Sequence, residues 1–599
     1  MTSKQALLPP LTADAPAPSP PQSEVWGSDA IADCLRALAV PYLALNPGAS
    51  YRGLHDSLVN HLGNTGPQML LCLHEESAVA IAHGYAKVGG CMMGAVVHSN
   101  VGLMHASMAV FNAWCDRVPL LLLGATGPWD AARRRPWIDW IHTASDQGAL
   151  VRDYTKWDNQ PGSVPAAVEA LLRASQIAQT APRGPVYVNL DAALQEEKIG
   201  ASPAPPDARR YAAPAAAPPA PEDLRRAAEL LSNASRPVIL MGRVSRDQGD
   251  WQRRVELAER LQARVITDLK TAAAFPTDHP QCAAPPNNFM APAACAALKE
   301  ADVVLLLDWV DPGGAFKQAL GDATPAAKVI HVSLDVHNHR GWSMDGGSLP
   351  PADVYMLCEA DAAVAGLLGV VRARPAGVWP VLMPLPAAPA DDVVSIRAIA
   401  DTLESATQGM ELTIARLTLG WNGAYRHFRH PLDYLGADGG GGVGAGPGNT
   451  VGIALALRDS GRLTVGIIGD GDFLMGNTAL WTAVHYQIPL LLIVCNNQSF
   501  FNDELHQERV AKERIRPVEN KWIGQRISEP AIDIAQMARS LGAEGIGPVT
   551  RARDLRAALD GAIVQVRAGK VCVIDARVAP GYDANMSGGT NASQASQKR

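Results

Sequence analysis

Short apolar runs alternate with amphipathic, helix-like segments along most of the chain. In the middle of the sequence, the runs at 236–242, 263–268, 301–309 and 327–335 each have the length of one buried strand and are separated by helical patterns. Strands of a parallel sheet are connected by such helices and are often buried on both faces. The pattern therefore predicts an α/β protein whose domains are mainly parallel sheets flanked by helices.

The first and last thirds of the chain resemble each other. Residues 93–127 predict a strand, a turn, a helix and a second strand, and residues 464–497 repeat this order. The second strand begins with Val-Pro-Leu-Leu-Leu in one segment and Ile-Pro-Leu-Leu-Leu in the other, where proline is tolerated because it precedes the ladder. We interpret the match as a duplicated sheet domain; for so short a match, chance is the alternative.

Two stretches rich in proline and alanine divide the chain into thirds. Proline at this density disfavours helices and central strands and is typical of extended linkers. The proline-rich N-terminal segment and the polar C-terminal segment are typical of disorder. The prediction is a disordered leader at 1–24, domains at 25–199, 225–372 and 393–582, linkers at 200–224 and 373–392, and a disordered tail at 583–599.

The composition excludes several classes of protein. Of the 599 residues, 47% are hydrophobic and 19% are charged, as in ordinary globular proteins of several domains. The net charge is −7 and no cluster of Lys and Arg includes aromatic residues, so we expect no nucleic acid partner. The nine cysteines form no CxxC pair and predict reduced, buried thiols. No apolar run approaches about 18 residues, and we expect a cytoplasmic protein without membrane contact.

Two predicted strands of the last third end in polar residues. One ends in Gly469-Asp470-Gly471 and the other reaches Asn497 at the end of an Asn-Asn pair. Ligands of parallel sheets bind beyond the carboxyl ends of strands, and a carboxylate with an amide oxygen suits Mg²⁺. The following helix begins near Asp472, where its N–H groups can hold a phosphate. A dinucleotide-binding turn would need GxGxxG, which is absent here; an acidic helix cap is the other alternative.

The Gly-Asp-Gly turn and the Asn-Asn pair, together with two further motifs, resemble the signature of the thiamine-diphosphate (ThDP) enzymes. The motifs are HEESAVAIAHGYAK at 74–87 and a glycine-rich turn at 439–457, in which Pro-Gly-Asn-Thr replaces the family's usual Leu-Pro-Ala-Ala. The three-part layout is similar to that of the branch with acetolactate synthase, benzoylformate decarboxylase and benzaldehyde lyase, over about residues 25–582. The resemblance implies a pyrimidine-binding domain, a middle domain and a diphosphate-binding domain, with ThDP and Mg²⁺ as cofactors.

The resemblance also implies roles for residues of the last third. Asp470, Asn497 and the main-chain oxygen of Ser499 would bind Mg²⁺. The Gly441 carbonyl would accept from the pyrimidine amino group, and Val443 would hold the cofactor in its bent form; a flexible hinge is the alternative for this run of glycines. The other implied cofactor contacts are Gly469, Gly471, Asp472 and Ser499.

Two catalytic residues are implied in the first third. Glu75 would hydrogen-bond the pyrimidine ring; the simpler role of an acid at a helix N-terminus is the one we assign to Glu76. His98 follows a strand in a stretch that resembles benzoylformate decarboxylase, where the histidine relays protons; a structural histidine is the alternative. The second active-site histidine of that enzyme has no counterpart near 308–316.

Four residues are candidates for substrate contact. Ser50, or its neighbour Ala49, stands where the family has a polar residue after the first turn, and Gln147 lies nearest the site by analogy. Two phenylalanines could line an apolar pocket. The charged stretch 498–522 is either an anion-binding lid or a solvated helix face, and we favour the solvated face. The substrate candidates are Ser50, Gln147, Phe500 and Phe501.

The implied function is ThDP- and Mg²⁺-dependent cleavage or formation of a C–C bond next to a carbonyl group, through a C2 ylide and an enamine. A 2-oxo acid decarboxylase, acyloin lyase or carboligase is our first interpretation. An acetolactate-synthase-like enzyme or 2-hydroxyacyl-CoA lyase, with ADP or coenzyme A near 241–247, is the second, and a non-catalytic ThDP-binding subunit is the third. In this family, the pyrimidine-binding site and the diphosphate-binding site of one active site come from different subunits. We therefore expect a homodimer or homotetramer that acts on a small carbonyl compound.

Overall fold

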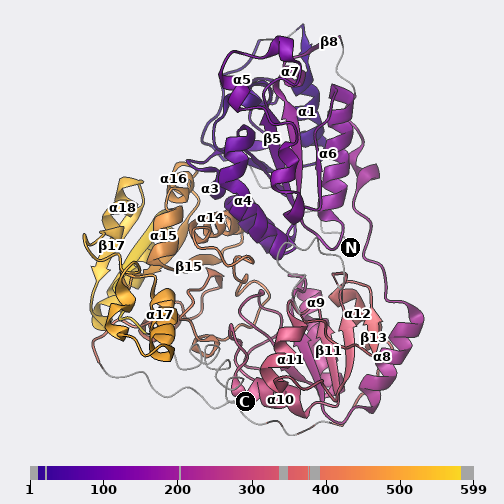
Figure 1. Cartoon of the computed structure of the whole chain (residues 1–599), viewed down its shortest axis with the longest axis vertical. Coiled ribbons are helices and arrows are strands. Elements are labelled where there is room, and N and C mark those ends of the chain that lie inside the picture. Colours follow the sequence, from indigo (N-terminus) through magenta and orange to yellow (C-terminus); the bar gives the residue numbers. More distant parts are fainter. Residues whose placement is uncertain are drawn as a thin grey trace.

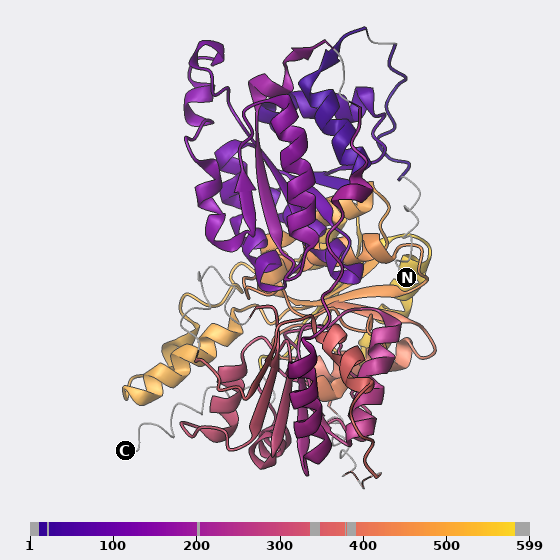
Figure 2. The same ribbon diagram turned by 90° about the vertical axis from the view of Figure 1, so that its right-hand side faces the viewer.

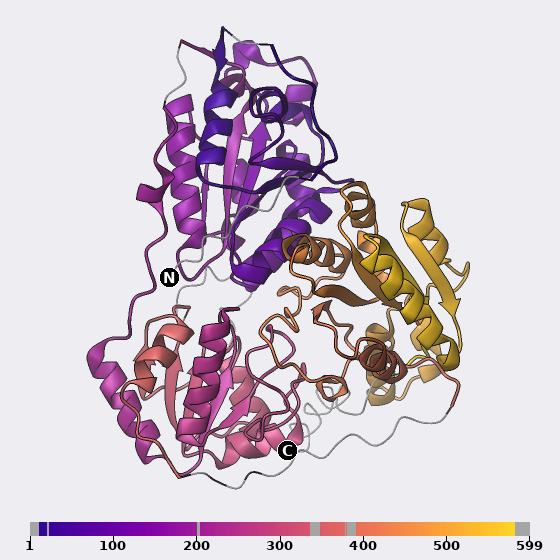
Figure 3. The ribbon, with the colours of Figure 1, turned by 180° about the vertical axis from the view of Figure 1, so that it is seen from behind.

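The computed structural model describes residues 11–20, 23–200, 204–335, 348–375, 377, 379 and 391–581. Three α/β domains surround a common centre in these residues, each with its own sheet (Figures 1 and 3). Every neighbouring pair of strands in the three large sheets is parallel. The predicted α/β class and the three-part division into parallel sheets are therefore confirmed.

The first domain has a six-stranded sheet of order β3-β2-β4-β5-β7-β6. Its inner strands are buried on both faces because helices cover each side. A short antiparallel pair of β1 and β8 joins the first and last residues of the domain. The strands are β1 (Val25–Trp26), β2 (Tyr42–Leu45), β3 (Gln68–Leu71), β4 (Met93–Val96), β5 (Leu120–Thr126), β6 (Trp157–Asn159), β7 (Pro185–Asp191) and β8 (Lys198–Ile199). The α-helices are α1 (Gly27–Ala37), α2 (Arg52–Asp56), α3 (Glu75–Gly89), α4 (Ser99–Cys115), α5 (Ile138–Ile141), α6 (Val164–Gln179) and α7 (Ala192–Gln195).

The middle domain has a five-stranded sheet of order β10-β9-β11-β12-β13. The four apolar runs predicted as strands form β9 to β12, whereas the short edge strand β13 has no long apolar run that could have announced it. The strands are β9 (Pro237–Met241), β10 (Arg264–Ile266), β11 (Val303–Leu307), β12 (Lys328–Val332) and β13 (Val354–Met356). The α-helices are α8 (Pro221–Asn233), α9 (Gln248–Leu261), α10 (Pro292–Glu300), α11 (Pro312–Leu320) and α12 (Ala360–Leu368).

The third domain has a five-stranded sheet of order β14-β15-β16-β18-β17. This order matches β2-β4-β5-β7-β6 of the first domain strand for strand, as expected for a duplicated sheet domain. The strands are β14 (Leu412–Arg416), β15 (Leu463–Gly469), β16 (Leu490–Cys495), β17 (Glu544–Val549) and β18 (Val571–Ala576). The α-helices are α13 (Ile396–Ala406), α14 (Gly446–Leu457), α15 (Asp470–Gly476), α16 (Ala479–His485), α17 (Phe501–Glu513), α18 (Ile534–Ser540) and α19 (Leu555–Arg567).

Helices α3 and α14 join the first and third domains (Figure 1). Small residues let the two backbones approach closely: a Cβ at Gly452 would stand 2.0 Å from the Ile81 carbonyl oxygen, and one at Gly84 would stand 2.2 Å from the Asn449 oxygen. One continuous apolar core therefore includes residues of both domains. This contact places the N-terminus of α3 beside the third domain.

Part of the predicted leader contacts the fold. Leu11 and the Gln68 side chain exchange two hydrogen bonds of 2.9 Å, and Asp14 accepts from the Tyr486 hydroxyl at 2.6 Å. Its proline-rich composition did not predict these contacts. The tail at 583–599 and most of the second linker lie outside the described residues, and the remaining domain boundaries stay predictions. No helix in the described part of the chain is long and apolar enough to span a membrane.

Candidate active site

Asp470 lies at the carboxyl end of β15 and begins α15. Its side chain is buried, and its carboxylate accepts the Gly471 N–H at 2.9 Å, with the main-chain N–H groups of Gln498 and Ser499 close by. Within the described residues, its second oxygen Oδ2 has no hydrogen-bond partner. Burial raises the pKa of Asp470 to about 6, although the three N–H groups oppose this shift. A bound cation would give Oδ2 of Asp470 a partner.

The loop after β16 supplies the other oxygen atoms. The strands β15 and β16 pair in parallel register, so Asp470 and the Asn-Asn pair end at the same edge of the sheet. Asn497 Oδ1 accepts the Ser499 N–H at 3.0 Å, whereas Asn496 donates to Asp575 at 2.8 Å and fixes the loop. The predicted metal ligands Asp470, Asn497 and Ser499 are thus brought together. Carboxylate, amide and main-chain oxygens are the donors that suit Mg²⁺.

The structure gives Asp472 a role that the sequence did not predict. Its Oδ1 accepts the N–H groups of Gly444 and Gly446 at 2.7 and 3.1 Å, and Arg416 lies 3.7 Å from its Oδ2. Burial raises the pKa of Asp472, and the charge of Arg416 opposes the shift. Asp472 therefore holds the glycine-rich turn in place from within α15.

The glycine positions leave room for a ligand. No described atom lies within 4 Å of where a Cβ would stand at Gly469 or at Gly441, and Gly441 has a φ of +74° that favours glycine. Val443 is partly exposed, and it lines the same cavity as Gly441. At Gly471 the reason for glycine differs, because a Cβ would stand 2.7 Å from the Phe500 ring. The open space fits a cofactor that crosses the turn and the strand end.

Glu75 is the first residue of α3 and is buried against α4. A Cβ at Gly102 of α4 would stand only 3.1 Å from Glu75 Oε1, so that the carboxylate occupies the space that glycine leaves. Glu75 Oε2 lies 3.2 Å from Nδ1 of His105. His74 caps the helix by accepting the Glu76 N–H at 3.2 Å. His105 was missed by sequence reasoning, because only the packing of α4 on α3 brings it to Glu75.

His98 lies at the carboxyl end of the first sheet, immediately before α4. Its Nδ1 is 2.8 Å from the Ser50 hydroxyl, which also accepts the Ser99 N–H at 3.2 Å. Ser50 is buried while Ala49 is exposed, so Ser50 is the polar residue of this turn. The ring of His142 lies edge-on to His98, with 4.6 Å between centroids and an interplanar angle of 82°. Burial and the charge of His142 lower the pKa of His98.

The glycine-rich turn lies along α4, next to the N-terminus of α3. The Gly440 N–H donates to Asn112 Oδ1 at 3.1 Å, and a Cβ at Gly442 would stand 2.5 Å from the Met108 side chain. Glu76 Oε1 lies 3.6 Å from the Cβ position of Gly444. Glu76 and the C-terminal half of α4 therefore lie beside the glycine-rich turn. Asp470, Asn497 and Ser499 together form the Asp470 cluster. Among the described residues, no hydrogen bond or ion pair joins Glu75 or His98 to this cluster.

The remaining substrate candidates lie in different places. Gln147 is buried in the first domain, where its amide donates to the Tyr187 hydroxyl at 2.7 Å and to the Ala125 oxygen at 3.2 Å, and none of its hydrogen bonds in the described structure reaches His98. Phe500 packs on Gly471, next to Asp470. Phe501 is half-buried at the start of α17.

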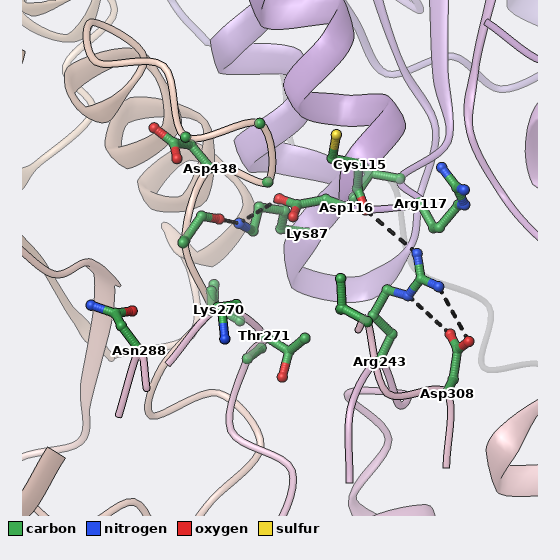
Figure 4. Close-up of a pocket in the computed structure, with 18 of the residues that line it drawn as sticks. Lys87, Cys115, Asp116, Arg117, Arg243, Lys270, Thr271, Asn288, Asp308 and Asp438 are labelled. Atoms are coloured by element: carbon green, nitrogen blue, oxygen red, sulfur yellow. Dashed lines mark hydrogen bonds and ion pairs between the residues drawn. The ribbon is translucent and has the colours of Figure 1, made fainter. Parts of the chain in front are cut away.

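A cavity of about 1950 Å³ opens among the three domains. Arg243 lies on its wall, 3.0 Å from Asp308 (Figure 4). Asp335 is 2.8 Å from the same guanidinium, so that both carboxylates offset its charge. Arg246 donates to the Ala273 oxygen at 3.2 Å, and burial lowers its pKa to about 10. Helix α17 also lines the cavity and projects from the body of the molecule (Figure 2). The stretch 241–247 thus faces a space that could hold an anionic group.

Comparisons with known proteins give one consistent result. Three family models match in order: the thiamine pyrophosphate enzyme N-terminal TPP binding domain at 25–150, the central domain at 224–341 and the C-terminal TPP binding domain at 418–576. Benzoylformate decarboxylase of Pseudomonas aeruginosa is 27% identical over 514 residues, or 83% of this chain and 90% of that relative. Acetolactate synthase isozyme 1 large subunit of Escherichia coli is 25% identical over 488 residues, or 79% and 82%.

Solved structures share the fold. A thiamine diphosphate-dependent 4-hydroxybenzoylformate decarboxylase of Rhodococcus jostii RHA1 has a TM-score of 0.75 at 21% identity, over 93% of this chain and 100% of that one. The benzoylformate decarboxylase of Polynucleobacter necessarius has a TM-score of 0.77 at 20% identity, over 93% and 99%. With three family models in their order along the chain, this protein belongs to the thiamine pyrophosphate enzyme family, and its relatives are ThDP-dependent decarboxylases and acetolactate synthases.

Proposed function

We propose that this protein is a ThDP- and Mg²⁺-dependent lyase that cleaves or forms a C–C bond next to the carbonyl group of a small 2-oxo acid or acyloin. The observation that carries the proposal is the group of Glu75, Ser50 and His98 at the carboxyl end of the first sheet, in which Glu75 and Ser50 are buried and Ser50 engages His98 at 2.8 Å. A carboxylate and a hydrogen-bonded histidine on one surface are suited to moving protons beside a bound cofactor.

The cofactor would be held by the third domain. Asp470, Asn497 and Ser499 would bind Mg²⁺, and the N-terminus of α15 with its open glycine at 469 would receive the diphosphate. When bound, ThDP supplies a thiazolium carbon that adds to a substrate carbonyl. The buried Glu75 carboxylate would hold the pyrimidine ring by a hydrogen bond.

The residues of the first domain would move the protons. Ser50 engages Nδ1 of His98, so Nε2 is the ring atom available to the substrate. A histidine that stays neutral near pH 7 can accept a proton there and return it later in the cycle. Similarity to the benzoylformate decarboxylase of Pseudomonas aeruginosa supports a 2-oxo acid decarboxylase or carboligase as the first choice.

A second candidate is an acetolactate-synthase-like enzyme or a 2-hydroxyacyl-CoA lyase. The large cavity beside Arg246 favours it, because a group such as ADP, FAD or coenzyme A would need such a space in the middle domain. A non-catalytic ThDP-binding subunit is the weakest candidate, since Glu75 would have no task there. We also propose a cytoplasmic homodimer or homotetramer with sites at the subunit interface.

The experiment is a circular dichroism titration of the apo protein with ThDP and Mg²⁺, followed by 2-oxo acids, acyloins and acyl-CoA esters. We expect a saturable cofactor signal that needs Mg²⁺ and changes with one class of substrate. Release of CO₂ with the free aldehyde as product would identify a decarboxylase, whereas condensation with a second 2-oxo acid, bound FAD or a response to acyl-CoA would favour the second candidate. Absence of any ThDP binding would refute the proposal.

A further inference from the structure

The histidine next to His98 lies in the loop that follows β5. The Gly127 N–H donates to the His142 carbonyl oxygen at 3.1 Å, which returns the loop to the end of the strand. Within the loop, the buried Asp139 accepts three hydrogen bonds from the main chain and side chain of Arg135, at 2.7 to 3.2 Å. These contacts hold His142 at the carboxyl end of the sheet, where His98 also lies.

The rings of His98 and His142 are in direct contact. His142 lies edge-on to His98 at 4.6 Å, while Ser50 holds Nδ1 of His98 from another direction at 2.8 Å. Ser99, the next residue, is fully buried with a φ of +30°. A non-glycine residue in this region is strained, and such residues are common at functional sites. The position of the His98 ring is therefore set from three sides.

Three charged groups act on His98, two from the segment around α5 and one from α3. Burial is the largest cause that lowers its pKa, followed by the charge of His142; Arg135 acts in the same direction, while Glu75 at the start of α3 opposes them. The lowering causes outweigh the carboxylate, so the His98 imidazole stays neutral to a lower pH than an exposed histidine does.

We propose that His98 and His142 form a two-histidine unit in which His142 is a positioning residue: its ring fixes the orientation of the His98 imidazole, and a proton on either ring disfavours a proton on the other. The inference rests on the proposed function, since it takes His98 as the group that exchanges protons with the substrate. A proton accepted at Nε2 of His98 in one half of the reaction is returned from the same atom in the other half. His142 has no counterpart in the sequence prediction, which found no second histidine near 308–316.

The first test uses the apo chain and needs no turnover. The titration of His98 is followed by NMR of histidine-labelled protein, with His98→Gln to assign the signal. We expect a wild-type midpoint below that of free histidine and a move to higher pH in His142→Phe, which keeps an aromatic ring but removes the charge. His142→Gln should move it in the same direction. A wild-type midpoint that is not lowered, or variants that leave the His98 titration unchanged, would overturn the proposal.

The second test measures the pH dependence of kcat and KM with ThDP and Mg²⁺ present. In His142→Phe we expect kcat to fall about tenfold with little change in KM, and the acid limb of kcat/KM to move to higher pH. His279→Phe is the matched control, because His279 makes a similar edge-on contact with Phe275 in the middle domain, at 5.0 Å and 72°. The control should leave the profile unchanged.

The two tests separate two kinds of failure. If the wild-type enzyme turns over none of the carbonyl compounds, the proposed function fails, while the NMR titration still decides the pair. If turnover is found but His142→Phe leaves the His98 titration unchanged and has the same pH profile as His279→Phe, the pair fails and the proposed function stands.

Discussion

The first and third sheets share one strand order, yet their equivalent strand ends carry different chemistry. The order β2-β4-β5-β7-β6 corresponds to β14-β15-β16-β18-β17, and β4 corresponds to β15. After β4 comes His98, which is held by the side chains of Ser50 and His142. After β15 comes Asp470, which is held by main-chain N–H groups. The scaffold thus specifies where a functional residue stands, and the local residues specify what it binds.

Burial has opposite consequences at these two positions. It disfavours the charged form of each group, so the pKa of His98 is lowered and that of Asp470 is raised to about 6. A neutral histidine is ready to accept a proton. The buried Asp470 carboxylate has one oxygen without a hydrogen-bond partner among the described residues. It is instead ready to bind a cation. In the proposed function, the duplicated domain therefore provides one strand end for proton transfer and one for cofactor binding.

The largest effect on turnover is expected when the Glu75 carboxylate of the first domain is removed. Glu75→Gln keeps the size of the side chain but not its charge, and we expect turnover to fall by about 10²–10⁴-fold. Mg²⁺-dependent ThDP binding should change little, because the Asp470 cluster is untouched. Steady-state kinetics and a fluorescence titration measure the two properties. Glu76→Gln is the matched control and should retain most activity; full activity in Glu75→Gln would show that the assignment is wrong.

Removing the Asp470 carboxylate of the third domain should instead impair cofactor binding. In Asp470→Asn we expect Mg²⁺-dependent ThDP binding to weaken by at least ~100-fold, because a charged ligand is lost while the neutral amide remains. Titration calorimetry with ThDP and Mg²⁺ measures the loss. Unchanged affinity would mean that the cation binds elsewhere, and the comparison of the two strand ends would then fail.

The apo form of the same variant should reveal the pKa shift. A carboxyl whose pKa is about 6 when folded and 3.8 when unfolded contributes stability below pH 3.8, and this contribution is lost as the pH rises to about 6. We therefore expect the free energy of unfolding of the wild type to fall by roughly 1–3 kcal/mol relative to Asp470→Asn between pH 4 and pH 6. Urea denaturation at several pH values measures this difference. Parallel pH profiles would contradict it.

A smaller effect is expected at the residue that holds the glycine-rich turn. Asp472→Ala leaves the N–H groups of Gly444 and Gly446 without their acceptor in a buried place, which should lower the free energy of unfolding by about 1–3 kcal/mol. ThDP affinity should fall as well, because the turn loses its fixed position. Asp472→Asn retains an acceptor oxygen and should fall between the wild type and the alanine variant.

The sequence predicted best what neighbouring strands bring together. Asp470 and Asn497 follow adjacent parallel strands, and the carboxyl ends of such strands meet at one edge, so their convergence follows from the pattern alone. His142 and His105 could not be found in this way. His142 reaches His98 through a loop that folds back on β5, and His105 reaches Glu75 through the packing of two helices. Such contacts depend on tertiary structure, which local patterns do not encode.

The smallest effects should distinguish the two glycines of the Gly-Asp-Gly turn. At Gly471 a Cβ would press on the Phe500 ring, so Gly471→Ala should destabilise the protein by about 1–3 kcal/mol. At Gly469 the space is open, so Gly469→Ala should change stability by no more than about 0.5 kcal/mol. The methyl group would nevertheless occupy the space proposed for the diphosphate, and ThDP affinity should fall. If Gly469→Ala binds ThDP as the wild type does, the diphosphate lies elsewhere, because the fold gives no other reason for glycine at this position.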